Sequence, residues 1–197
     1  MGGLLVLEGP KGVGKTTVVN ALRMNLSDAQ GGRVLLTKEP TAEFDLDQEA
    51  HLLGSRLAQA IALDRARHVK EVISPALDAG KVVICDRYVL SSLVFHSADG
   101  VSAEEIWLLN QTFPLPDVNF LLTASPVVID RRLGGRSVHT RLEGIGDPGD
   151  ESDKYLHFGR GMQNRGSQLK IISNETPEEL QQALTWIMHF IESGLSI

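Results

Sequence analysis

The chain has 197 residues and a mass of 21.5 kDa, with 42% hydrophobic and 22% charged residues, which predicts one globular domain over residues 1–197 with a substantial core. A net charge of −6 argues against non-specific binding to nucleic acid or to anionic membranes, because those tasks favour basic surfaces. The single cysteine excludes an internal disulfide framework, and the lack of a signal-peptide pattern or a membrane-length apolar stretch makes us expect a cytoplasmic protein.

The first predicted strand, Gly3 to Leu7, leads into a glycine-rich loop that a helical pattern follows. Strand, loop and helix in this order are the context of a phosphate-binding P-loop, in which backbone N–H groups point at phosphate oxygens. Lys15 is expected to reach the β- and γ-phosphates, and the Thr16 hydroxyl to hold Mg²⁺. The triphosphate-binding residues predicted from the motif are Gly9, Lys11, Gly12, Val13, Gly14, Lys15, Thr16 and Thr17.

Next come a strand over 33–37, a loop over 38–47 and a long helical region over 48–77 that is possibly broken in the middle. Within that region, Arg65 and Arg67 are too close in sequence to share one helix face. We therefore expect one of them to face a cleft and the other to face solvent. Arg65 is assigned to the cleft, and a solvated charged face is the alternative.

A third strand over 82–85 ends at Asp86, so this carboxylate is expected at the edge of the sheet where ligands bind in open α/β folds. Next to a P-loop, Asp86 would hold Mg²⁺ directly or through water. Arg87 beside it is suited to grip a second anionic group with two parallel hydrogen bonds. The alternative is a structural Asp–Arg pair, and Cys85 is expected to be buried in the strand.

The rest of the chain continues to alternate between strand-like and helix-like segments. This pattern predicts an α/β fold with a mainly parallel sheet. Residues 155–168 are ambiguous, because three glycines weaken the helical pattern. Among the clear segments, residues 88–95 are expected to begin a helix. Further helices are predicted over 102–109, 126–133 and 177–191, and strands over 118–122 and 169–173.

Between the helix over 126–133 and the ambiguous segment, residues 134–153 are rich in glycine and acids and poor in apolar side chains. They are expected to form a lid, with an ordinary surface loop as the alternative. Arginines at or near its start, delivered by closure, would stabilise charge on a transferred phosphoryl group and help to exclude water. The arginines concerned are Arg131, Arg132, Arg136 and Arg141.

Several segments together resemble the thymidylate kinase family in order and separation. The resemblance covers nearly the whole chain and is clearest over residues 3–125. Its most specific parts are Asp-Arg-Ala-x-His-Val and Asp-Arg-Tyr-x-x-Ser-Ser. The segments are the P-loop, Thr37–Pro40, Leu63–Val69, Cys85–Ser92, Pro116-Asp117, Arg141–Glu143 and Thr176–Glu179.

The resemblance implies a three-layer P-loop fold with a five-stranded parallel sheet flanked by helices, a lid, a homodimer, and Mg·ATP-dependent phosphorylation of dTMP to dTDP. It assigns the metal to Thr16 and Asp86, and places Ser173 to Thr176 near the adenine. The expected catalytic residues are Lys15, Asp86, Arg132 and Arg136. The expected acceptor contacts are Lys38, Glu39, Ile61, Arg65, Arg87, Ser91, Ser92, Phe95, His96 and Arg141, with an ordinary buried histidine as the alternative for His96.

The acceptor half departs from the family pattern. Lys11 stands where the family usually has a carboxylate near the acceptor sugar, Ile61 replaces a stacking aromatic residue, and Lys38 replaces an arginine. The usual Asp-Arg-x-Glu also begins with Thr140. The expected partners are small-molecule nucleotides, and dTMP is the expected acceptor. A modified nucleotide, a nucleoside or a specialised metabolite is the alternative acceptor, and nucleotide binding without phosphotransfer is the alternative activity.

Overall fold

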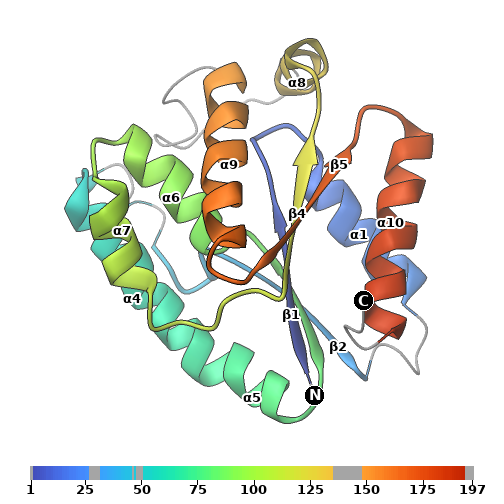
Figure 1. Ribbon diagram of the computed structural model, residues 1–197, viewed down its shortest axis with the longest axis horizontal. Helices are drawn as coiled ribbons and strands as arrows, with labels where there is room; N and C mark the ends of the chain where they lie inside the picture. Colours follow the sequence, from blue (N-terminus) through green and yellow to red (C-terminus); the bar gives the residue numbers. More distant parts are fainter. Residues whose placement is uncertain (1, 27–31, 46, 48–50, 135–147, 194–197) are drawn as a thin grey trace.

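The structure is a computed structural model that describes residues 2–26, 32–45, 47, 51–134 and 148–193. Its centre is a parallel sheet with the strand order β2-β3-β1-β4-β5, which confirms the α/β fold with a five-stranded parallel sheet (Figure 1). The strands are β1 (Gly3–Glu8), β2 (Val34–Lys38), β3 (Val82–Asp86), β4 (Val118–Thr123) and β5 (Gln168–Ser173).

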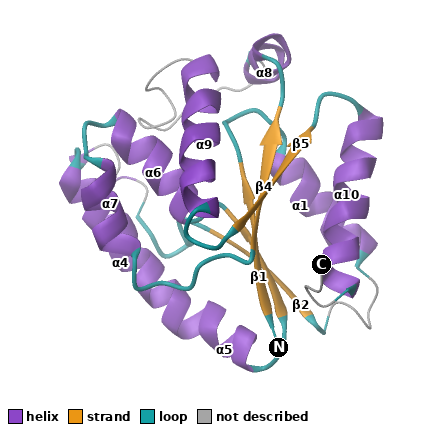
Figure 2. Cartoon of the chain, in the orientation of Figure 1, coloured by secondary structure: helices purple, strands orange, loops and turns teal. Residues whose placement is uncertain are grey.

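Helices cover both faces of this sheet, giving three layers (Figure 2). α1 and α10 pack on one face, whereas α4 to α7 and α9 pack on the other. None of the described helices is long and apolar enough to cross a membrane. The helices are α1 (Lys15–Asn25), α4 (Ser55–His68), the π-helix η1 (Val69–Ile73), α5 (Ser74–Asp78), α6 (Val89–Ala98), α7 (Ala103–Asn110), α8 (Pro126–Leu133), α9 (Pro148–Gln163) and α10 (Pro177–Glu192).

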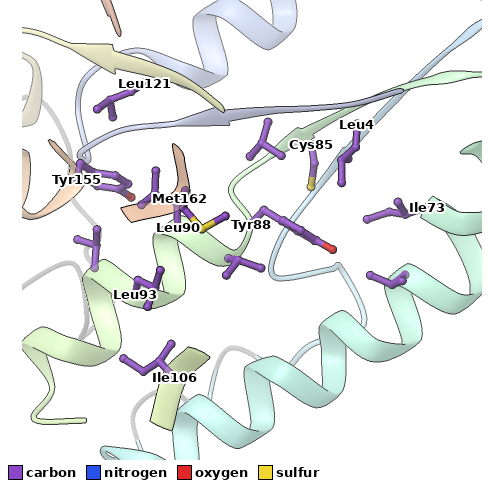
Figure 3. Packing of buried hydrophobic residues seen from close by; sticks show 14 of the residues in the cluster. Leu4, Ile73, Cys85, Tyr88, Leu90, Leu93, Ile106, Leu121, Tyr155 and Met162 are labelled. Carbon is purple, nitrogen blue, oxygen red and sulfur yellow. The ribbon is translucent and has the colours of Figure 1, made fainter. Parts of the chain in front are cut away.

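The two cores follow from the alternation of side chains along the strands. In β1, Leu4 and Val6 face the core under α6 and α9, whereas Leu5 and Leu7 face the core under α1 and α10. Strands buried on both faces need continuous apolar runs, which is why β1, β3 and β4 consist largely of valine, leucine and isoleucine. Figure 3 shows the first core, where Leu4 and Cys85 of the sheet lie near Tyr88 and Leu90.

The long helical region predicted over 48–77 begins later than expected, since Leu52 and Leu53 are not helical and α4 starts at Ser55. From there the helix continues without a break, and only its type changes. α4 passes into the π-helix η1 and then into α5, in which Pro75 is one of the first residues. Proline has no N–H, and in a regular α-helix its ring would press on the carbonyl of Glu71. The wider turn of η1 accommodates the proline without ending the helix.

Helix α9 changes the boundaries expected from the sequence. Residues 148–153 of the predicted lid are helical, and so is most of the ambiguous segment 155–168. Burial of Tyr155 and Met162 against the sheet stabilises this helix, and a Cβ on Gly159 would lie 3.1 Å from the Leu169 side chain, so glycine permits the close approach. The rest of the predicted lid, residues 135–147 with Arg136 and Arg141, lies outside the described residues.

Candidate functional site

The P-loop between β1 and α1 is built on glycines in left-handed backbone conformations. Gly9, Gly12 and Gly14 have φ values of 139°, 77° and 102°. A Cβ at Gly9 would lie 2.4 Å from the carbonyl oxygen of Leu122, and one at Gly14 would lie 2.5 Å from Nδ2 of Asn174. Only glycine therefore fits, both sterically and conformationally, which explains why the motif requires it here.

Two side chains from the far half of the chain hold the P-loop from outside. The carbonyl of Val13 accepts hydrogen bonds from Asn174 Nδ2 at 2.7 Å and from Arg132 Nη1 at 3.1 Å. Arg132 Nη2 also donates to the carbonyl of Glu175 at 3.4 Å. The structure thus places Arg132, expected to be catalytic, against the back of the P-loop, next to the loop that precedes α10.

Lys15, the first residue of α1, is folded back onto its own loop. Its Nζ donates to the carbonyls of Gly9 at 2.6 Å and Pro10 at 2.9 Å. Burial and, to a smaller extent, the nearby Arg87 guanidinium lower the pKa of Lys15 to about 7, against the raising effects of Asp86 and other carboxylates. An amine in this state is ready to gain charge when phosphates arrive.

Asp86 ends β3, as predicted, at the carboxyl edge of the sheet. Its Oδ1 is buried and makes no hydrogen bond within the described residues. Asp86 and Thr16 both line one groove of about 740 Å³, which brings a residue with a carboxylate and a residue with a hydroxyl to the same space. Hard oxygen ligands of this kind suit a divalent cation such as Mg²⁺.

The same groove gathers part of the predicted acceptor site along the open edge of β2. Lys38 is exposed there, whereas Glu39 is buried. Thr41 and Asp64 meet beside them, with the Thr41 hydroxyl 2.7 Å from Asp64 Oδ1. The site residues predicted from the sequence that line the groove are Thr16, Lys38, Glu39, Asp86 and Arg87.

Arg65 is buried at 2% exposure, whereas the side chain of Arg67 is 53% exposed. Arg65 thus faces the interior and Arg67 the surface, and it is Arg67 that stands among the residues lining the groove, so the assignment of Arg65 to a cleft stays a prediction. Arg65 Nε donates to Glu39 Oε2 at 2.7 Å and Nη2 to Ser92 Oγ at 3.0 Å. Its Nη1 bonds to Asn110, so the guanidinium organises these polar groups in the interior. Half-buried Ile61 lies one turn earlier on α4.

Glu39, His68 and Cys85 offer three ligand atoms within 4.8 Å of one another. The two ring nitrogens of His68 are already hydrogen-bonded, to Glu39 at 2.9 Å and to the Thr37 hydroxyl at 2.7 Å. Burial also raises the pKa of the Cys85 thiol well above its usual value. The Cys85 thiol also donates to the Arg87 carbonyl at 3.0 Å, so each of the three groups already has a hydrogen-bond partner within the protein, and we interpret the cluster as part of the hydrogen-bonded interior.

Helix α6 supplies the remaining predicted acceptor residues. Ser91, Ser92 and His96 are buried, and Phe95 is half-buried. The Phe95 ring centre lies 4.9 Å from Cζ of Arg87, within cation–π distance. Ser91, Phe95 and Arg87 are thus brought together, while Ser92 joins Arg65.

Sequence reasoning missed Glu8, the last residue of β1. It is fully buried and accepts hydrogen bonds from Tyr88 N–H at 2.9 Å, Ser91 N–H at 3.2 Å and Ser91 Oγ at 2.5 Å. Burial raises its pKa, while Ser91 and the cations Arg87 and Lys15 lower it. The signal was available, since Glu8 ends an apolar strand just as Asp86 does.

Two residues of α9 were also missed. Glu151 Oε1 accepts a hydrogen bond from the backbone N–H of Lys11 at 3.2 Å, and the Tyr155 hydroxyl lies 2.9 Å from Arg87 Nη1. Both side chains lie on one face of the helix, four residues apart. Glu151 lies in the segment predicted as a lid and Tyr155 in the segment with a weak helical pattern, so no sequence signal connected them to the site.

Comparison with known proteins identifies the family of the chain. A family model described as thymidylate kinase matches residues 7–182. A probable thymidylate kinase of Pyrococcus abyssi is 49% identical over 61% of this chain and 64% of its own length. The probable thymidylate kinase of Pyrococcus horikoshii is 40% identical over 73% of this chain and 76% of its own length.

A solved thymidylate kinase from Ehrlichia chaffeensis superposes with a TM-score of 0.69 at 19% identity, covering 96% of this chain and 98% of that one. At this identity the likeness shows the fold alone. The family model and the archaeal relatives carry the assignment further: the chain belongs to the thymidylate kinase family, the phosphotransferases that form dTDP from dTMP with ATP as phosphate donor.

Proposed function

We propose that the chain phosphorylates dTMP with its P-loop as the ATP site and Arg87 as the ligand of the acceptor phosphate. The observation that supports these two roles is that Lys15, Asp86 and Arg87 lie beyond the ends of neighbouring strands. Leu7 of β1 pairs with Asp86 of β3, and Arg87 N–H donates to the Leu7 carbonyl at 3.0 Å. The charge of Asp86 acts on both the Lys15 amine and the Arg87 guanidinium, so the donor and acceptor cations share one carboxylate as a neighbour.

On the donor side, the P-loop N–H groups and Lys15 bind the triphosphate. Phosphate charge favours the protonated amine, so Lys15 leaves the carbonyls of Gly9 and Pro10 and turns to the phosphates. Thr16 and Asp86 would hold Mg²⁺, which when bound neutralises part of the phosphate charge. Catalysis of this kind depends on positioning and electrostatics more than on a strong base.

On the acceptor side, Arg87 binds the phosphate of the monophosphate, and the polar groups around Arg65 and Glu39 line the adjoining interior. Lys11 and Ile61 differ from the family pattern in this half, so the acceptor range is the property to measure first. Arg136 and Arg141 remain proposed contributors, Arg136 to catalysis and Arg141 to acceptor binding. The homodimer is likewise proposed from the family alone, and sedimentation of the purified protein tests it.

The test is a panel of dTMP, dUMP, thymidine and other nucleoside monophosphates, each supplied with Mg·ATP while ADP release is followed. We expect dTMP to be the best acceptor and thymidine to fail, because thymidine lacks the phosphate that Arg87 binds. Comparable turnover of thymidine would contradict the role of Arg87. ADP release without any acceptor would contradict the kinase assignment.

A further inference from the structure

We propose that Tyr155 of α9 is a positioning residue that aims the Arg87 guanidinium at the acceptor phosphate. The inference rests on the proposed role of Arg87. Tyr155 is fully buried, and its hydroxyl lies 2.9 Å from both Arg87 Nη1 and Ser91 Oγ. It belongs to α9, which begins within the expected lid and packs against α6 (Figure 3).

The hydrogen bonds form a chain with one direction. Ser91 Oγ donates to Glu8 Oε2 at 2.5 Å, so its oxygen is left as an acceptor for the Tyr155 hydroxyl. The Tyr155 oxygen in turn accepts from Arg87 Nη1. A buried carboxylate is thus connected to the guanidinium through two hydroxyls, and charge-assisted bonds at both ends strengthen the arrangement.

Aromatic contacts also hold the guanidinium. Phe95 lies 4.9 Å from Cζ of Arg87 and meets the Tyr155 ring edge-to-face, with centroids 6.4 Å apart and an interplanar angle of 89°. Arg87 also has a φ of 69°, a left-handed conformation that is uncommon for a residue with a side chain and that often marks functional sites.

One edge of the guanidinium remains available. Nη1 donates to Tyr155 and, at 3.3 Å, to Ser91, whereas Nε and Nη2 make no hydrogen bond to the part of the chain that the structure describes. Nε and Nη2 together form the fork that binds an oxyanion with two parallel bonds. Tyr155 therefore anchors one side of Arg87 and leaves the other side for the acceptor phosphate.

The first variant to test is Tyr155→Phe, which keeps the ring and its packing and removes only the hydroxyl. Loss of a hydrogen bond to a charged group predicts that the KM and the calorimetric Kd for dTMP rise by about tenfold. The KM for ATP should change by less than about twofold, since the P-loop contacts stay in place. Tyr88→Phe is the matched control, because its hydroxyl is also buried but makes no hydrogen bond within the described residues.

A merely structural role would behave differently. Equal losses for ATP and dTMP with a lowered melting temperature, or no change in the dTMP Kd, would overturn the inference. In an Arg87→Lys background, adding Tyr155→Phe should raise the Kd for dTMP little further, because the guanidinium that Tyr155 positions is no longer present. Fully additive effects of the two substitutions on this Kd would also overturn the inference. Ser91→Ala interrupts the same chain elsewhere, and a dTMP Kd unchanged in that variant would also count against the inference.

The outcomes separate this inference from the proposed function. If the unmodified enzyme does not phosphorylate dTMP, the proposed function fails. If it does, and Tyr155→Phe binds dTMP normally, only the role of Tyr155 fails.

Discussion

Nucleotide binding should be coupled to proton uptake at Lys15 when the pH is raised above neutrality. Burial and the Arg87 charge hold the pKa of this amine at about 7, instead of its ordinary value of 10.5. Phosphates favour the charged form, so the amine must take up a proton whenever it is neutral before binding. The number of protons taken up therefore reports the fraction of Lys15 that is neutral before the nucleotide binds.

The magnitude follows from the titration of a single group. With a pKa near 7, the amine is about 0.9 neutral at pH 8 and about 0.1 neutral at pH 6, and the uptake per bound nucleotide should follow these fractions. Well above pH 7, affinity for the triphosphate should fall by about tenfold for each further pH unit. The reason is that binding requires the protonated amine, whose fraction falls at the same rate.

The assay is isothermal titration calorimetry of Mg·ATP without acceptor, in buffers with different ionisation enthalpies. Lys15→Arg is the control, because a guanidinium stays charged throughout this pH range and should abolish the uptake. The difference between the two proteins isolates the lysine from protons on the nucleotide or on other groups. Equal uptake by both proteins at pH 8 would refute the reasoning.

Three further substitutions test how the site is held together. Glu8→Ala should lower the free energy of unfolding in urea by at least ~2 kcal/mol, because it leaves two backbone N–H groups buried without an acceptor; a loss below ~0.5 kcal/mol would speak against this. Gly14→Ala should weaken ATP binding by roughly tenfold through backbone strain and the clash with Asn174, whereas Gly32→Ala, with open space around it, should not; equal affinities would remove the steric argument. Arg132→Ala should raise the KM for ATP by about fivefold through loss of its bond to the Val13 carbonyl, and a fall in kcat with unchanged KM would instead point to contact with the transferred phosphoryl group.

The donor half was predictable because its signals are local. Gly9 to Thr16 specify strand, loop and helix within one stretch, and Asp86 follows an apolar strand directly. Even the inward face of α4 could be predicted, since Arg65 lies four residues after apolar Ile61. Glu8 was predictable in the same way, because it also ends an apolar strand.

The parts that could not be predicted depend on tertiary packing. Tyr155 and Glu151 reach the site only because α9 packs against α6 and the sheet, while the glycines of α9 weaken its helical pattern. The partners of Arg65 likewise come from the residue after β2 and from α6 and α7, and no spacing in the sequence connects Glu39, Ser92 and Asn110. Burial stabilises both arrangements where local propensity is weak.

The most direct measurement is the formation of dTDP from dTMP and Mg·ATP by the unmodified protein and by Lys15→Ala. Removing one key charge-stabilising donor should cut turnover by at least ~10²-fold, while the unmodified protein forms dTDP and ADP in equal amounts. Near-normal turnover by Lys15→Ala, or ADP without matching dTDP, would contradict a P-loop kinase that acts on dTMP.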